Sequence, residues 1–175
     1  MFDAPLIPSW NGLHPLIIHF PIALLLTAPL FVIIGGVLSP PKGKSFLISA
    51  LILMALGTAS VFLSTETGEA AKGKLGSDPV IKVVIVEHQD LAEASEVLFS
   101  VLTIAFAALL FLPRWVHVEL GHRVNEALLA VFLIFYATGI LFLINTAHHG
   151  GILVHEMGVR SPMTHSVSAS VGSGQ

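Results

Sequence analysis

Residues 124–145 read VNEALLAVFLIFYATGILFLIN, in which Glu126 is the single charged residue. At a rise of about 1.5 Å per residue, a helix of roughly 20 apolar residues crosses a hydrocarbon core of about 30 Å. Three other stretches have the same character: residues 15–38, 45–64 and 91–112. The pattern predicts an all-α fold, a four-helix transmembrane bundle.

The composition of the whole chain points the same way. Of its 175 residues, 54% are hydrophobic and 11% are charged, and the mean hydropathy is +0.87. Soluble domains carry about 25% charged residues, so the excess apolar side chains here must face membrane lipids. A net charge of −3 without a basic patch argues against a nucleic-acid partner. The absence of cysteine excludes thiolate metal sites and covalent haem attachment.

The short loops predict the orientation in the membrane. Lys42 and Lys44 follow the first span, and Arg114 and Arg123 lie between the third and the fourth. By the positive-inside tendency these loops are cytoplasmic, which puts both termini on the outer, periplasmic side of a bacterial inner membrane. Residues 1–160 are expected to form a single membrane domain and residues 161–175 a flexible polar tail. No internal repeat is evident.

Gly, Pro and Asp residues predict where the helices begin, bend and end. Asp78 before Pro79 is typical of an N-cap, so a helix is expected from about residue 80 into the third span, after a polar connection that begins at residue 65. Residues 35–36 and residues 150–151 are Gly-Gly pairs, and each pair is interpreted as a helix end. Pro21 and Pro29 are expected to kink the first span and to free backbone carbonyls.

Nine histidines stand against eight lysines and arginines, and most of them fall at the outer ends of the spans. Neutral imidazole is a common ligand of iron, copper and zinc, and ionisable groups in a membrane are usually functional. The candidate cofactor-binding residues are His14, His19, His88 and His148. Each of these histidines could instead be a side chain at the membrane interface that binds no ligand. His117, His122 and His165 are interpreted as interfacial side chains of this kind.

Two kinds of ligand remain open. One histidine from each of two facing helices suits bis-imidazole haem b, with His19 and His88 as iron ligands. Three small side chains one or two turns away would leave room for a flat ligand, although ordinary helix packing is the favoured interpretation of them: Ala23, Ala92 and Ser95. Three aromatic side chains are expected to supply an apolar shell: Phe20, Phe99 and Phe142. Glu66, together with the outer histidines, keeps a divalent-metal site as the alternative.

Two motifs resemble a known family. Residues 13–24, LHPLIIHFPIAL, and the ending GGILV at residues 150–154 with Gly158 and Val159 are similar to the bacterial membrane family catalogued as domain of unknown function 2231. The resemblance implies a four-helix membrane protein found near, or fused to, c-type cytochromes and other respiratory components. It favours His14, His19 and His88 over the other histidines. His155 departs from the family, which more often has an aromatic residue there.

These observations lead to a functional hypothesis. A b-type cytochrome-like subunit would carry electrons through a bis-His haem near the outer face, with c-type cytochrome subunits and a quinone as candidate partners. The alternatives are a cofactor-free subunit that anchors a larger membrane complex and an outer-face divalent-metal-binding protein. The sequence has no nucleophile-elbow or phosphate-binding motif, so an electron-transfer or structural subunit is expected rather than a complete enzyme.

Overall fold

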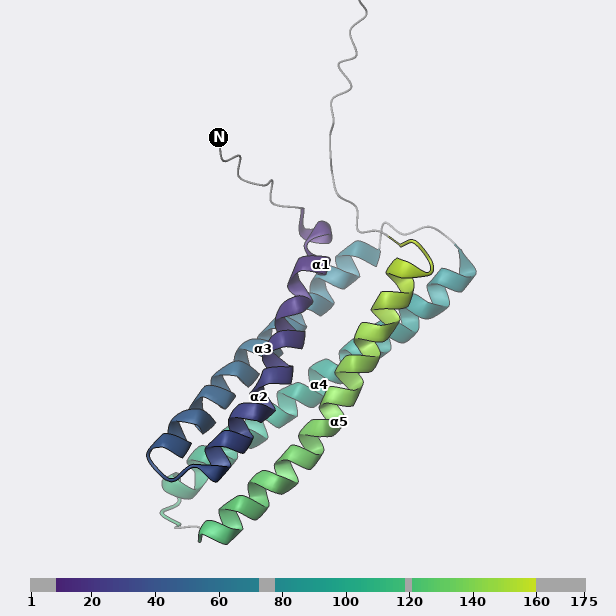
Figure 1. Cartoon of the computed structure of the whole chain (residues 1–175). Coiled ribbons are helices and arrows are strands. Elements are labelled where there is room, and N and C mark those ends of the chain that lie inside the picture. The colour runs from purple at the N-terminus through teal and green to yellow at the C-terminus, as the bar shows by residue number, and fades with distance from the viewer. Residues whose placement is uncertain (1–8, 73–77, 119–120, 160–175) are drawn as a thin grey trace, which may run out of the picture.

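All regular structure is helical in the residues that the computed structural model describes, which are 9–72, 78–118 and 121–159. The elements are η1 (Trp10–Gly12), α1 (His14–Ile17), α2 (His19–Val37), α3 (Lys42–Lys72), α4 (Pro79–Trp115) and α5 (His122–His155) (Figure 1). Four segments are long and apolar enough to cross a membrane: α1 with α2, then α3, α4 and α5. The chain is therefore a multi-pass membrane protein. The predicted tail, residues 161–175, lies outside the described residues.

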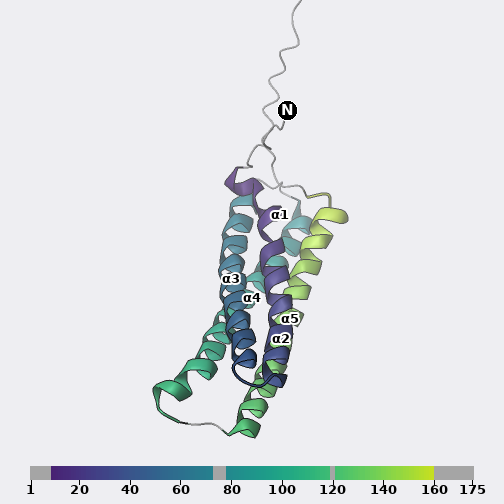
Figure 2. The ribbon, with the colours of Figure 1, turned by 60° about the vertical axis from the view of Figure 1, so that its left-hand side comes forward.

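The four long helices form a ring in the order α2, α3, α4, α5, in which each contacts its two neighbours. Helices α2 and α4 run in one direction and α3 and α5 in the other, so both ends of the described chain lie at one end of the bundle (Figures 1 and 2). We call this the outer end. It agrees with the prediction that both termini share one side, and the choice of the periplasmic side stays a prediction.

The helices extend further at the outer end than the sequence indicated. The Asp78 carboxylate accepts a hydrogen bond from the Val80 amide at 2.8 Å, which confirms the predicted N-cap of α4. Helix α3, however, continues to Lys72, so the connection expected from residue 65 is largely helical. Helix α2 ends at Val37, one residue after the first glycine pair and close to the expected end, whereas the end expected at residues 150–151 was wrong, because α5 continues to His155. Packing against neighbouring helices outweighs the low helix propensity of glycine.

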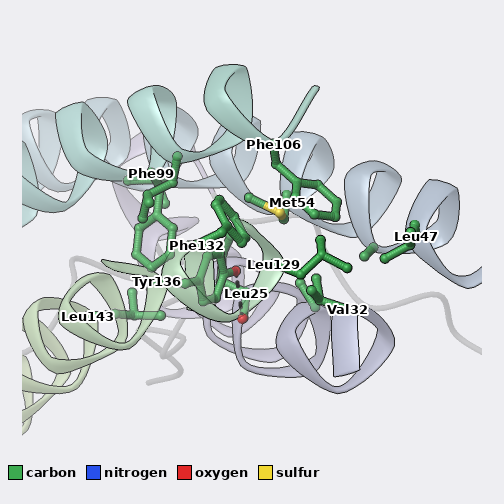
Figure 3. Packing of buried hydrophobic residues seen from close by; sticks show 14 residues of the cluster. Leu25, Val32, Leu47, Met54, Phe99, Phe106, Leu129, Phe132, Tyr136 and Leu143 are labelled. Carbon is green, nitrogen blue, oxygen red and sulfur yellow. Dashed lines mark hydrogen bonds between the residues drawn. The ribbon is translucent and has the colours of Figure 1, made fainter. Parts of the chain in front are cut away.

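An aromatic cluster fills the middle of the bundle (Figure 3). The rings of Phe106 and Phe132 are 4.8 Å apart, and those of Phe99 and Tyr136 are 5.5 Å apart in an edge-to-face arrangement. Leu25 from α2 completes this buried core. Large apolar side chains also cover the outside of all four helices, as expected for a surface that faces lipid.

The two halves of the bundle repeat one pattern that the sequence did not reveal. Four of the five buried positions of α2 recur at the same intervals in α4, pairing Pro21 with Ser95, Leu25 with Phe99, Ala28 with Leu102 and Val32 with Phe106. Five of the eight buried positions of α3 recur in α5, pairing Leu47 with Leu129, Ala50 with Phe132, Met54 with Tyr136, Gly57 with Gly139 and Val61 with Leu143. From this shared pattern and the ring order we infer an approximate two-fold relation between the halves.

Candidate functional site

His14 and His88 meet inside the outer end of the bundle. Their ring centroids are 6.4 Å apart and the ring planes are nearly perpendicular, at 83°. Each ring is half-buried. His14 lies seven residues before Pro21 and His88 seven residues before Ser95, so the two histidines are equivalent under the two-fold relation.

The backbone of α3 holds the His14 ring. His14 Nδ1 lies 2.9 Å from the Ser64 carbonyl oxygen and 3.3 Å from the Thr67 hydroxyl. A carbonyl oxygen can only accept, so Nδ1 carries the proton and donates. One turn further along α3, a Cβ placed on Gly68 would lie 3.1 Å from His14 Cε1. The glycine therefore gives the imidazole the space in which it rests against α3.

Helix α5 holds the His88 ring in the same way. His88 Nδ1 donates to the Thr146 carbonyl oxygen at 2.9 Å. A Cβ placed on Gly150, one turn after Thr146, would lie 3.2 Å from His88 Cε1. The Thr146 hydroxyl in turn lies 3.2 Å from that of Ser95 on α4, which ties the two helices together beside the histidine. Both rings thus rest on a carbonyl and a glycine of the adjacent helix.

This anchoring determines which nitrogen of each imidazole can bind a ligand. With Nδ1 protonated, the neutral ring keeps its lone pair on Nε2. Metal-ligating histidines are commonly oriented by such a bond from the other ring nitrogen to a backbone carbonyl. The pair His14 and His88 therefore offers two fixed imidazoles, each with Nε2 as its acceptor nitrogen.

Both histidines line a cavity of about 470 Å³ at the outer end. Ligand pockets generally fall between about 300 and 1,000 Å³. The lining is largely aliphatic and includes Ile18, Ile22, Ile85, Leu143 and Leu153. The Ser64 hydroxyl is buried in this lining without a hydrogen-bond partner among the described residues. Such an orphaned group in a cavity indicates a site that a ligand or water completes.

The structure separates the four predicted histidines. It brings His14 and His88 together, and it places His19 on the cavity lining with an exposed side chain. His148 is exposed, does not line the cavity and packs against His149, with ring centroids 5.9 Å apart. Glu66, the alternative metal ligand, is also exposed and away from the cavity. Within the described part of the chain, no three His, Asp or Glu side chains gather closely enough to hold a metal ion.

The predicted surroundings of the site need partial correction. Ala92 and Ser95 line the cavity as expected, but Ala23 is exposed and does not. The expected aromatic shell was wrong, because none of its three members lines the cavity. Phe99 lies deeper, in the core, and helix phase turns the other two outward, with Phe20 60% exposed and Phe142 37% exposed.

Sequence reasoning missed the residues that hold the two rings. Ser64 with Gly68 and Thr146 with Gly150 share one signal, a hydroxyl residue followed by glycine one helical turn later. Small residues at this spacing are common at helix contacts in membranes, so the pattern indicates a histidine-holding site only where a histidine is known to face it.

Comparisons with family models, curated proteins and solved structures find no match to this chain. The fold and the site together define a four-helix, multi-pass membrane protein with a pair of histidines in a cavity. The cavity lies at the end of the bundle where the described chain begins and ends.

Proposed function

We propose that this protein is a b-type cytochrome-like membrane subunit that carries electrons through a haem held by His14 and His88. The observation that carries the proposal is the paired anchoring of the two imidazoles by the Ser64 and Thr146 carbonyls. The resemblance of residues 13–24 to a membrane family associated with respiratory components also supports it. Under this proposal His88 is one of the two ligands, as in the sequence-based hypothesis, and His14 is the other in place of His19.

The spacing of the two rings is compatible with His14 and His88 holding one metal centre between them. A metal–nitrogen bond is about 2 Å long, so two imidazoles that shared one metal would have ring centroids about 6 Å apart. The ring centroids in the structure are 6.4 Å apart. The Gly68 and Gly150 contacts keep both rings pressed against the helices that flank the cavity.

A bound haem would supply one-electron redox chemistry, and the residues of this chain would determine its setting. The carbonyl bonds at Nδ1 raise the ligand strength of each imidazole and fix its orientation. The aliphatic lining, which includes Ile85 and Leu143, excludes water and thereby tunes the reduction potential. A site at one end of the bundle would exchange electrons with a partner at that membrane face, such as a c-type cytochrome or a membrane quinone.

The metal-ion alternative receives less support from the described residues. Structural zinc sites use four protein ligands and catalytic ones three, whereas the cavity pairs two imidazoles. Two histidines from facing helices instead match bis-imidazole haem ligation in a bundle. The anchoring-subunit alternative predicts that the cavity binds neither.

An absorption spectrum of the detergent-purified full chain, oxidised and dithionite-reduced, tests the proposal. Protein produced with ample haem should show a Soret band and a reduced α band typical of b-type haem. His14→Ala and His88→Ala should each abolish the bis-imidazole spectrum, whereas the matched variants His19→Ala and His148→Ala should keep it. A featureless visible spectrum would overturn the proposal, and metal analysis would then separate the metal-binding protein from the anchoring subunit.

A further inference from the structure

The residues around the two histidines match in the two halves of the bundle, but the residues one helical turn beyond the two glycines do not. On α3, the residues that face the cavity at successive turns are Ser64, Gly68 and Lys72. The equivalent positions of α5 are Thr146, Gly150 and Val154, which also line the cavity. The positions that hold the two rings are thus matched, whereas the next turn offers an ammonium group on one side and an aliphatic side chain on the other.

The Lys72 ammonium group has N–H donors that the described residues do not use. Its ammonium group donates to the Gln89 side-chain oxygen on α4, which accounts for one of its three N–H donors. The Gln89 amide nitrogen donates to Glu69 and to Glu93, both at 3.0 Å, and this holds its oxygen toward Lys72. Among the described residues, no carboxylate lies within ion-pair distance of the Lys72 nitrogen. Two donors therefore remain for a ligand at the rim of the cavity.

The opposite side of the cavity is mainly aliphatic. Val154 is accompanied there by Leu153, Leu143 and Ala147 of α5 and by Ile18 at the end of α1, and His155, the last residue of α5, is the ionisable side chain on this side. The backbone of helix α1 does not approach that of α4 or α5 within 8 Å, so this seam is less closely packed than the α3–α4 side. The α3 side of the cavity thus carries the charged side chains Lys72 and Glu69, whereas the α5 side is mainly aliphatic around Val154.

We infer that Lys72 binds the carboxylate edge of the ligand, so that the cavity accepts a planar amphiphilic anion in one orientation, with its apolar edge toward Val154. This inference rests on the proposed function, since haem b carries two propionates on one edge and only apolar substituents on the other. Glu69 also lines the cavity and would oppose an anion, but its exposed carboxylate accepts from Gln89, and solvent screens it.

The test compares haem b with its dimethyl ester, which has the same ring and iron but no carboxylate charge. Both are titrated into the purified full chain and followed by Soret absorbance. The wild type should bind the free acid about tenfold more tightly than the ester, the size of one charge-assisted hydrogen bond. Lys72→Met should remove this preference and Lys72→Arg should retain it. Glu69→Gln should leave the preference intact or enlarge it.

The outcomes separate the role of Lys72 from the proposed haem-binding function. Equal affinities for acid and ester in the wild type, or an unchanged preference in Lys72→Met, would overturn the role of Lys72 while leaving bis-His ligation in place. If neither compound binds with a bis-imidazole spectrum, the proposed function fails, and this inference fails with it.

A charge swap tests the orientation independently. The double variant Lys72→Val with Val154→Lys moves the ammonium group to the two-fold-related position. Paramagnetic NMR of the haem methyl groups should show one dominant orientation in the wild type and the reversed one in the swap. The same orientation in both proteins would contradict the inference.

Discussion

The Tyr136 hydroxyl donates a hydrogen bond of 2.9 Å to the backbone carbonyl of Leu25 (Figure 3). Pro29, four residues after Leu25 in the same helix, has no N–H and leaves this carbonyl without its helical partner. Both Leu25 and Tyr136 are buried in the core, away from bulk solvent, so the carbonyl needs a donor from a neighbouring helix. Tyr136 of α5 thus supplies the hydrogen-bond donor that Pro29 cannot supply within α2.

Removing this hydroxyl should destabilise the protein only while the proline is present. Tyr136→Phe should lower the free energy of unfolding by about 1–3 kcal/mol, because it leaves a buried acceptor unpaired. In a Pro29→Ala background, the new amide of residue 29 can donate to the Leu25 carbonyl, so the same substitution should have less than half that effect. Unfolding in mixed micelles across the double-mutant cycle measures this coupling. Equal losses in both backgrounds would show that the two residues act independently.

The glycines beneath the two imidazoles should be needed for ligand binding. Gly68→Ala and Gly150→Ala place a methyl group 3.1 and 3.2 Å from Cε1 of His14 and His88, closer than carbon atoms normally pack. Each ring must shift, and we expect haem affinity to fall about tenfold or more, since ligand geometry is sensitive to small displacements.

Gly36→Ala is the matched control, because a Cβ at Gly36 meets its nearest atom at 3.5 Å and the residue does not line the cavity. Haem titration and thermal unfolding of the apo forms measure binding and folding separately. Wild-type affinity in Gly68→Ala and Gly150→Ala would contradict the proposed seating of the rings.

Removal of the orphaned Ser64 hydroxyl should stabilise the ligand-free protein without raising its affinity for the ligand. Ser64→Ala removes a buried, unpaired polar group while keeping the carbonyl that anchors His14. We expect the apo protein to gain about 1 kcal/mol of stability, whereas ligand affinity falls or stays unchanged. Thermal unfolding with and without haem measures both effects. A loss of apo stability would show that the hydroxyl has a partner in the folded protein.

The two-fold relation predicts equivalent packing at Gly57 and Gly139. A Cβ at Gly57 would lie 2.7 Å from Leu25, and one at Gly139 would lie 3.1 Å from Leu102 and 3.2 Å from Phe99. Substitution of either glycine by alanine should destabilise the bundle by about 1–3 kcal/mol through overpacking, with the larger effect at Gly57. Gly36→Ala, with its nearest contact at 3.5 Å, should be nearly neutral. Micelle unfolding of the three variants tests this order.

The sequence by itself determined the parts of this protein that depend on local chemistry. Long apolar stretches specify membrane-spanning helices, because a lipid environment leaves the backbone few other ways to satisfy its hydrogen bonds. Asp78 before Pro79 specifies a helix start, and Pro29 specifies a carbonyl without its helical partner, since each effect acts within one turn of the chain. The same local reasoning placed His14 and His88 at the same level of the bundle.

Only the tertiary structure decided which of these groups meet. His14 and His88 become a pair because helix phase turns both toward the axis, while it turns His148 and Glu66 outward. The anchoring carbonyls come from other helices, and contacts between distant segments leave no local spacing for a sequence pattern to reveal. The repeat was invisible for a related reason: its halves share buried positions rather than residue identities, and burial is set by the packing of all four helices.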